Sequence, residues 1–290
     1  MSLEKHILLP DGRKLTYAEF GKPDGRPVMY FHGAPSSRME PLLIGNEKWV
    51  QSGLRVIAPD RPGIGGSDFQ PNRGFSDWPR DVLALADSLG LDRFPVLGNS
   101  GGGPYVAVCA ARIPERLTSA VIVSGGWQMN LPEAKNNIPF VNRIFLLLAA
   151  HAPPLLRVML KAMGGSSVGE RDKELAKLKT RIPAADYAAF AEPGRIEALH
   201  EMMRSCMQNG TKGAAWDLGL YMRDFDFQLH EVQMPLKLFH GELDVNAPIA
   251  LVRSMVAKLP GAHLVTYEDE AHFSTLCNHF DEITLAVDNQ

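Results

Sequence analysis

Three polar residues that lie far apart in the sequence have the types required for nucleophilic catalysis. Ser100 is the centre of GNSGG at residues 98–102, which matches the pattern G-x-S-x-G. Asp244 and His272 follow it in that order. A serine hydroxyl is a weak nucleophile unless a general base takes its proton, and that base needs a third group to hold its tautomer. If the fold brings these side chains together, they could form and hydrolyse an acyl-enzyme.

The residues on both sides of Ser100 predict a strand and a helix. Residues 94–97 predict a short buried strand, and residues 101–112 predict a helix that stops before Pro114. A nucleophile on a sharp turn between a strand and a helix has strained backbone dihedrals and needs small neighbours, which the surrounding glycines provide. A glycine-rich phosphate loop is the alternative interpretation. The segment has neither G-x-G-x-x-G nor GK[ST], which disfavours it.

Asp244 and His272 each follow a predicted strand in the last part of the sequence. Residues 236–239 precede Asp244, and residues 263–267 precede His272. The carboxyl ends of parallel strands share one edge of a sheet, where ligands bind. We therefore expect Asp244 and His272 to meet Ser100 at this edge.

The first part of the sequence alternates between short apolar runs and a helical pattern. The runs predict buried strands at residues 28–31, 54–58 and 120–123. Residues 75–89 carry apolar side chains at helical spacing. Ahead of them, residues 5–9 and 14–20 predict a β-hairpin. This alternation predicts an α/β fold with a mostly parallel central sheet and flanking helices.

The alternation stops after residue 126 and resumes about 100 residues later. The stretch between predicts helices, one of them over residues 195–208. A helix at 248–259 and another at 273–287 then accompany the last two strands. We therefore expect one α/β domain interrupted by a helical insertion. The expected bounds are a first core part at 1–126, a helical insertion at 127–226 and a second core part at 227–290.

Composition excludes several classes of protein. The chain has 290 residues, 45% of them hydrophobic and 22% charged, which disfavours a disordered chain. The formal net charge of −3 offers no basic excess, so we expect no nucleic-acid partner. The apolar run at residues 145–150 is far below the roughly 20 residues of a membrane helix. With no signal-peptide pattern at the N-terminus, we expect a cytoplasmic monomer or homodimer that acts on a small molecule. Three widely spaced cysteines are expected to be reduced thiols: Cys109, Cys206 and Cys277.

Several short motifs together resemble the α/β-hydrolase superfamily over nearly the full length. They are HGAP at 32–35, DRPGIGGSD at 60–68, the segment around Ser100, HGELD at 240–244 and EDEAH at 268–272. The order serine, aspartate, histidine is also that of this superfamily. The resemblance implies that the insertion at 127–226 is a cap between the sixth and seventh strands.

The resemblance also implies a role for each site residue. Ser100 would be the nucleophile, His272 the general base and then acid, and Asp244 the carboxylate that orients the histidine. The backbone N–H groups of Ala34 and Gly101 would form the oxyanion hole. No cofactor or metal is implied. A serine nucleophile argues against the haloalkane dehalogenase and epoxide hydrolase branches, whose covalent step needs a carboxylate.

Other residues have a structural and a functional interpretation. Trp127 follows the strand at 120–123 and is a candidate pocket wall. Residues 145–148 could form a cap core or an apolar substrate groove, and the methionines of the cap could do the same. Asp60 and Arg61 are expected to cap a turn and form ion pairs, and His32 to shape its loop.

These observations favour a cofactor-independent serine hydrolase that cleaves a small-molecule carboxylic ester through an acyl-enzyme on Ser100. A first alternative resembles the proline iminopeptidases, in which acidic cap residues hold the free amine of the substrate. Glu192, Glu197 and Glu201 are available for that role. A second alternative is a non-catalytic small-molecule receptor on the same fold. Lactone, thioester or carbon–carbon bond cleavage also remains compatible with these residues.

Overall fold

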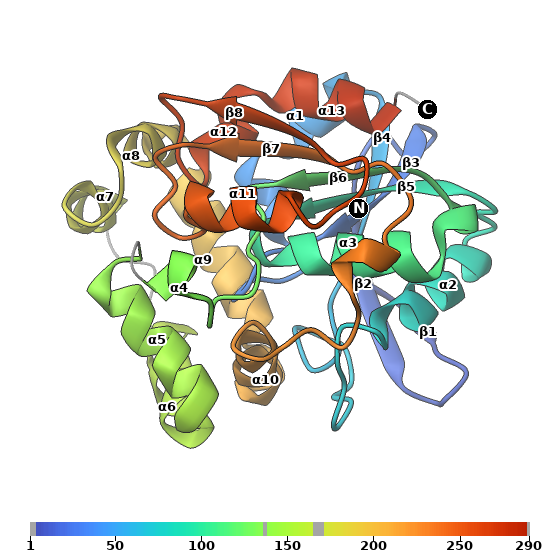
Figure 1. The fold of residues 1–290 in the computed structure, drawn as a ribbon, viewed down its shortest axis with the longest axis horizontal. Helices are drawn as coiled ribbons and strands as arrows, with labels where there is room; N and C mark the ends of the chain where they lie inside the picture. The colour runs from blue at the N-terminus through green and yellow to red at the C-terminus, as the bar shows by residue number, and fades with distance from the viewer. Residues whose placement is uncertain (1–3, 136–137, 165–170, 289–290) are drawn as a thin grey trace.

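Eight strands form one sheet in the order β1-β2-β4-β3-β5-β6-β7-β8 (Figure 1). The computed structural model describes residues 4–135, 138–164 and 171–288. The strands are β1 (Lys5–Leu8), β2 (Lys14–Gly21), β3 (Arg26–Phe31), β4 (Leu54–Pro59), β5 (Phe94–Asn99), β6 (Leu117–Val123), β7 (Lys237–Gly241) and β8 (His263–Tyr267). The β1–β2 and β2–β4 pairs are antiparallel, and the pairs from β4 to β8 are parallel. The predicted hairpin and the mostly parallel sheet are thus confirmed.

The central strands are buried because helices cover both faces of the sheet. Successive residues of β3 alternate between two core clusters: Met29 and Phe31 lie in one, and Val28 and Tyr30 lie in the other. The first cluster packs under α2 (Trp78–Ser88), α3 (Gly103–Arg112) and α11 (Ile249–Val256). The second packs under α1 (Asn46–Gln51), α12 (Ser274–Asn278) and α13 (Phe280–Asp288). This two-sided burial explains why these strands are apolar runs in the sequence.

The predicted helix at 273–287 is wrong in one respect, because the structure divides it at His279. The backbone of His279 leaves the helical region, and its ring stacks on Tyr267 at a centroid distance of 3.5 Å. This contact joins residues on different elements, and a helical period does not encode it.

Seven α-helices and the 3-10 helix Leu229–Glu231 lie between β6 and β7 among the described residues. The α-helices form one group in the chain. They are α4 (Pro132–Lys135), α5 (Phe140–His151), α6 (Pro153–Gly164), α7 (Arg171–Lys179), α8 (Ala184–Ala191), α9 (Arg195–Cys206) and α10 (Lys212–Leu220). We call residues 127–226 the cap segment. Figure 1 shows α5, α6 and α7 at the side of the molecule, away from the sheet. Within the described ranges, no helix is long and apolar enough to cross a membrane. All three cysteines are free and buried.

The close packing of β5, β3 and α3 requires glycine at position 102. A Cβ atom at this position would lie 2.1 Å from the carbonyl oxygen of Phe31, which is closer than van der Waals contact allows. We expect Gly102→Ala to lower the free energy of unfolding by about 3 kcal/mol, because the strand cannot move without disturbing the core. Gly219→Ala is the matched control, since its Cβ would meet its nearest neighbour, Ala149 O, at 3.4 Å. Urea unfolding measures both variants, and equal midpoints would contradict this account.

Candidate active site

Ser100 lies where β5 passes through a short 3-10 turn into α3. Its backbone φ is +52°, a left-handed conformation that non-glycine residues rarely adopt. Such strain concentrates at functional sites. The carbonyl oxygen of Ser100 accepts a hydrogen bond from the amide of Gly126 at 2.7 Å, which fixes this turn against the chain that leaves β6. The strand, turn and helix predicted around Ser100 are all present.

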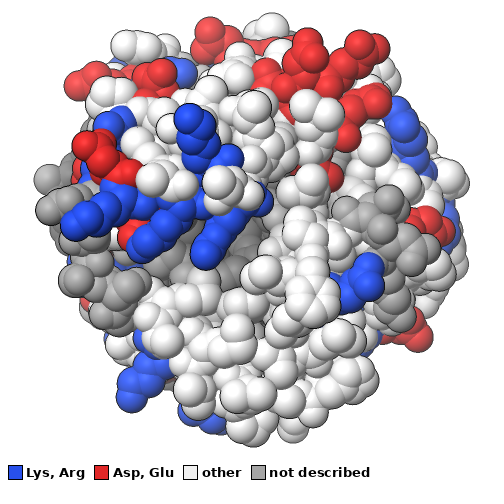
Figure 2. Space-filling model, turned by 90° about the vertical axis from the view of Figure 1, so that its left-hand side faces the viewer, with Lys and Arg blue, Asp and Glu red and all other residues white. Residues whose placement is uncertain are grey.

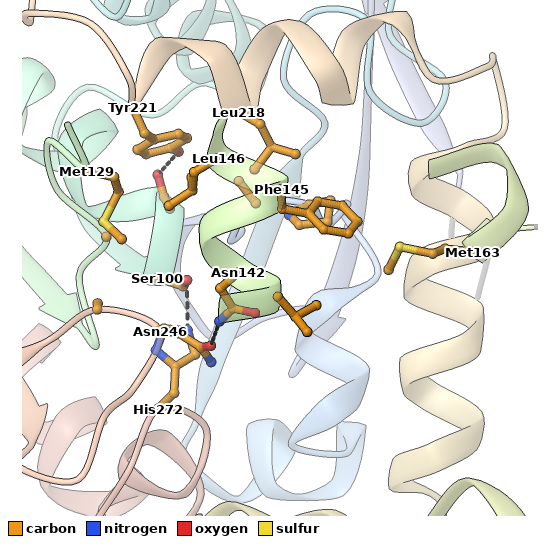
Figure 3. Close-up of a pocket in the computed structure, with 16 residues that line it drawn as sticks. Ser100, Met129, Asn142, Phe145, Leu146, Met163, Leu218, Tyr221, Asn246 and His272 are labelled. Atoms are coloured by element: carbon orange, nitrogen blue, oxygen red, sulfur yellow. Dashed lines mark hydrogen bonds between the residues drawn. The ribbon is translucent and has the colours of Figure 1, made fainter. Parts of the chain in front are cut away.

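His272 and Asp244 form a hydrogen-bonded chain with Ser100. The distance from Ser100 Oγ to His272 Nε2 is 2.8 Å (Figure 3). The distance from His272 Nδ1 to Asp244 Oδ2 is 2.7 Å. The other oxygen of Asp244 accepts from the amides of Asn246 and Ala247, each at 2.8 Å. The loops after β5, β7 and β8 thus bring together the three residues singled out by the sequence.

The electrostatics of His272 and Asp244 favour a charged imidazolium beside an ionised carboxylate. Burial favours the neutral carboxyl of Asp244, but the attraction and hydrogen bond of His272 lower the pKa of Asp244 below its ordinary value. Burial also disfavours the imidazolium, yet the attraction of Asp244 outweighs it and raises the pKa of His272 to about 9. The buried carboxylate of Asp244 therefore stabilises the protonated form of His272.

The two amides expected to form the oxyanion hole flank the same space. Ala34, Gly101, Ser100 and His272 all line one cavity. A Cβ atom on Gly101 would lie 2.9 Å from the amide nitrogen of Ala34, so the two backbone segments are in close contact. A backbone amide donates whatever its side chain is, so these two positions were expected from the family resemblance and not from the residue types themselves.

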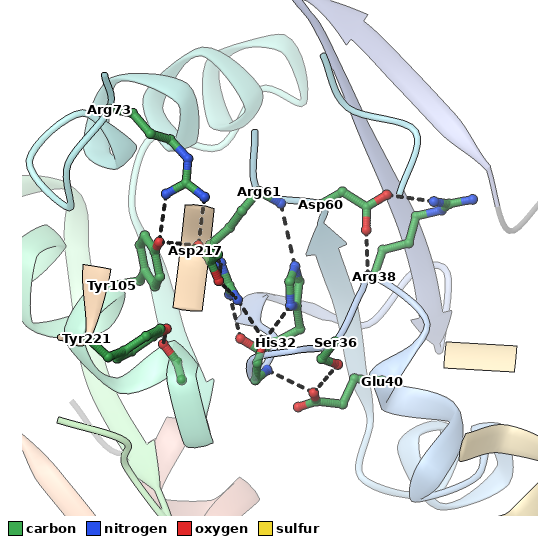
Figure 4. A network of polar contacts seen from close by, with 12 residues as sticks. His32, Ser36, Arg38, Glu40, Asp60, Arg61, Arg73, Tyr105, Asp217 and Tyr221 are labelled. Atoms are coloured by element: carbon green, nitrogen blue, oxygen red, sulfur yellow. Dashed lines mark hydrogen bonds and ion pairs between the residues drawn. The ribbon is translucent and has the colours of Figure 1, made fainter. Parts of the chain in front are cut away.

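Glu40 supports this arrangement and was not foreseen from the sequence. Its buried carboxylate accepts from the amide of Gly33 at 2.8 Å, from Asn99 Nδ2 at 2.9 Å and from the Tyr30 hydroxyl at 2.8 Å. The hydroxyl of Ser36 is a fourth donor (Figure 4). Glu40 therefore joins the loop after β3 to the end of β5, directly before Ser100. A glutamate within an apolar stretch was the available signal.

The cavity has a volume of about 380 Å³ and a largely apolar lining (Figure 3). Besides the residues above, its lining includes Met129, Val141, Asn142, Phe145, Leu146, Met163, Leu218, Tyr221 and Asn246. Asn142 of α5 donates to Asn246 of the loop after β7 at 2.7 Å. The Tyr221 hydroxyl donates to the carbonyl of Gly101 at 2.5 Å. No Asp, Glu, Lys or Arg is among the described residues that line it.

The candidate pocket residue Trp127 and the three glutamates of the aminopeptidase alternative all lie outside the cavity lining. Trp127 is fully buried in the core cluster that includes α3 and α11, and it is not part of the cavity lining. Its indole packs against Gly125, which turns it away from the site. Glu192 and Glu197 are exposed and do not line the cavity. Glu201 pairs with Arg204 at 2.7 Å, also outside the cavity.

The buried residues of the loop after β4 match their predicted structural roles. Asp60 pairs with Arg38 at 2.6 Å, and Arg61 pairs with Asp217 of the cap segment at 2.7 Å. His32 is fully buried, and burial together with the nearby Arg61 lowers its pKa, so it is neutral. Its ring lies near the amide of Arg61 (Figure 4).

Comparison with known proteins defines the family. The model of the alpha/beta hydrolase fold matches residues 26–276, and the chain belongs to this family of hydrolases. It is similar to a non-heme haloperoxidase from Rhodococcus erythropolis, with 35% identity over 282 residues that cover 92% of each chain. It is 25% identical over 276 residues to a 2-hydroxymuconate semialdehyde hydrolase from Pseudomonas putida, covering 92% of this chain and 87% of that one. The fold is shared with an esterase from a Rhodococcus species, with a TM-score of 0.67, 20% identity and 99% coverage of both chains.

The pKa of His272 provides a direct test of this geometry. We expect the imidazole to titrate near pH 9, because the buried carboxylate of Asp244 stabilises its charged form. In Asp244→Asn the attraction of this carboxylate is lost while burial remains, so the pKa of His272 should fall clearly from about 9, with Asp186 and Glu40 still favouring the charged form. Histidine NMR resonances followed against pH measure both values. His32 is the internal control, because burial and the nearby Arg61 hold its pKa well below the ordinary value. A His272 pKa that is unchanged by the substitution would contradict the pairing.

Proposed function

We propose that this protein is a cofactor-independent serine hydrolase that cleaves small-molecule carboxylic esters through an acyl-enzyme on Ser100. The observation that carries the proposal is the continuous chain of hydrogen bonds from Ser100 through His272 to Asp244, at 2.8 and 2.7 Å. The same chain opens onto an apolar cavity rather than onto the core. A general base beside a serine, with a third group to orient it, is the arrangement that activates a hydroxyl.

The proposed reaction has two halves. Ser100 Oγ attacks the ester carbonyl carbon and gives its proton to His272 Nε2, while the carbonyl oxygen becomes negative and accepts from the amides of Ala34 and Gly101. The carbon–oxygen bond to the alcohol then breaks, and His272 returns the proton to the leaving alkoxide. Water attacks the acyl-enzyme while His272 takes one of its protons, and the bond from the acyl carbon to Ser100 Oγ then breaks as His272 gives this proton to Oγ and the acid leaves. Both halves require neutral His272, so the rate should rise with pH toward its raised pKa.

The cavity supports a neutral, mostly apolar substrate. Its described lining contains no group that could compensate a charged carboxylate or ammonium. Val141 lines the cavity and is 65% exposed, so the apolar lining continues to the surface of α5. Figure 2 shows this side of the molecule, with Lys and Arg side chains gathered above a broad uncharged area. A muconate-type substrate, such as the relative from Pseudomonas putida is named for, carries a charge that this lining does not match.

The cap segment at 127–226 is proposed to select the substrate. Phe145, Leu146, Leu218 and Tyr221 belong to it and line the cavity, so they would contact the acyl or alcohol group. The aminopeptidase alternative loses its support, because the three glutamates considered for amine binding do not line the cavity. The receptor alternative does not account for the hydrogen-bonded arrangement of Ser100, His272 and Asp244.

Reaction with a fluorophosphonate probe tests the proposed nucleophile. We expect one covalent adduct on Ser100, detected by intact mass and peptide mapping, and none in Ser100→Ala. The variant should unfold at the same urea concentration as the wild type while ester turnover disappears. Turnover by a folded Ser100→Ala variant would refute the assignment, and so would an adduct on another residue.

Substrate charge tests the proposed substrate class. We compare the p-nitrophenyl ester of butyrate with that of hemisuccinate, which has the same chain length and a terminal carboxylate. We expect kcat/KM to be at least about tenfold higher for butyrate, because the carboxylate would enter the cavity without a compensating charge. Leu146→Lys would place a cation in the cavity lining, so it should bring the two values of kcat/KM closer together. Equal values of kcat/KM for the two esters in the wild type would contradict the proposed class.

A further inference from the structure

The oxyanion hole proposed above is built from peptide groups whose oxygen atoms are also hydrogen-bonded. The amide N–H of Ala34 belongs to the same peptide group as the carbonyl of Gly33. That carbonyl accepts from Arg61 Nη2 at 2.6 Å, and the preceding carbonyl, of His32, accepts from Arg61 Nη1 at 2.5 Å (Figure 4). The guanidinium therefore contacts the far end of the peptide whose N–H faces the reaction.

Arg61 brings a buried positive charge to this peptide. Its side chain is 1% exposed, and its partner Asp217, from α10 of the cap segment, is 2% exposed. Asp217 also pairs with the buried Arg73 at 2.6 Å and accepts from the Tyr105 hydroxyl at 2.6 Å. Two guanidinium groups thus share one carboxylate, and His32 beside them is neutral. Arg61, Arg73 and Asp217 together carry one net positive charge on this side of the loop that carries Ala34, and the Glu40 carboxylate bonds the loop from the other side.

A buried charge is costly unless it is paired and hydrogen-bonded, and the hydrogen bonds of Arg61 go to Asp217 and to the two carbonyls of this loop. A neutral donor would be enough to hold two carbonyls in place. Hydrogen bonds from a charged donor are stronger, and a bond at the oxygen of a peptide strengthens the donor capacity of its N–H. Arginine can reach both carbonyls and Asp217 at once because its donors form a fixed planar fork.

We propose that Arg61, held by Asp217, is a positioning residue that fixes and polarises the Gly33–Ala34 peptide, so that the Ala34 amide stabilises the transition-state oxyanion. This inference rests on the proposed acyl-enzyme chemistry. Because Asp217 orients the guanidinium of Arg61, the cap segment contributes indirectly to the geometry of the oxyanion hole. If Arg61 were only a structural anchor, its substitution would lower the stability of the fold. It would not weaken binding of the transition state more than binding of the ester.

Arg73 is the matched control for Arg61. It is equally buried and pairs with the same carboxylate, but its hydrogen bonds go to Asp217 and Tyr105 and not to the loop of Ala34. We compare Arg61→Lys and Arg61→Met with Arg73→Lys and Arg73→Met. For each we measure the unfolding midpoint, kcat and KM for a neutral ester, and inhibition by a trifluoromethyl ketone, which forms an anionic adduct with serine. The ketone without fluorine reports on ground-state binding.

We expect both Arg61 variants to lower kcat by at least about tenfold and to keep KM within about threefold of the wild-type value. This loss is smaller than that caused by removing an oxyanion donor altogether, because the Ala34 amide is still present. Affinity for the trifluoromethyl ketone should fall in parallel, while affinity for the plain ketone should not change. The Arg73 variants should lose comparable stability but keep kcat within about threefold. Arg61→Lys keeps a cation at this position, so it remains the decisive variant if Arg61→Met fails to fold.

Two results would overturn the inference. One is a folded Arg61→Lys variant with the kcat of the wild type. The other is an equal loss of kcat in the Arg61 and Arg73 variants. A wild-type protein that forms no adduct with the trifluoromethyl ketone would instead refute the proposed function itself, together with everything that rests on it.

Discussion

The left-handed backbone of Ser100, at φ +52°, is the constraint on which the site depends. It turns the chain sharply from β5 into α3 and exposes the hydroxyl at the carboxyl edge of the sheet. Because β3, β5, β7 and β8 run parallel, their following loops arrive at that same edge. Ala34, Asp244 and His272 are therefore neighbours of Ser100 for topological reasons. The strain is tolerated because close-packed neighbours hold the turn on both sides.

Buried charged groups hold the surrounding loops. Glu40 binds the loop after β3 from one side, and Arg61 binds it from the other. Asp244 is held by two backbone amides of its own loop and holds His272 in turn. Such groups contribute little net stability, because desolvation offsets much of their attraction. Their consistent effect is to fix the direction of backbone amides and of one imidazole, which is what a preorganised site requires.

The sequence predicts the sheet and the positions of Ser100, Asp244 and His272 because local patterns encode them. Buried strands are visible as apolar runs, and each of these three residues lies in the segment that follows such a strand. The direction of Trp127 was not predictable in the same way, since it depends on the turn at the glycines after β6. The Arg61–Asp217 pair joins positions 156 residues apart, and Glu40 gains its meaning from partners on β3 and β5. Those contacts come from tertiary packing, which a single sequence does not display.

The most direct test of the account is a crystal structure of the protein with a trifluoromethyl ketone bound covalently. We predict a bond from Ser100 Oγ to the ketone carbon, with the adduct oxygen roughly 2.7–3.1 Å from the amide nitrogens of both Ala34 and Gly101. The guanidinium of Arg61 should still contact the carbonyl of Gly33. An adduct on a different residue, or an oxygen that points away from these two amides, would contradict the central claim.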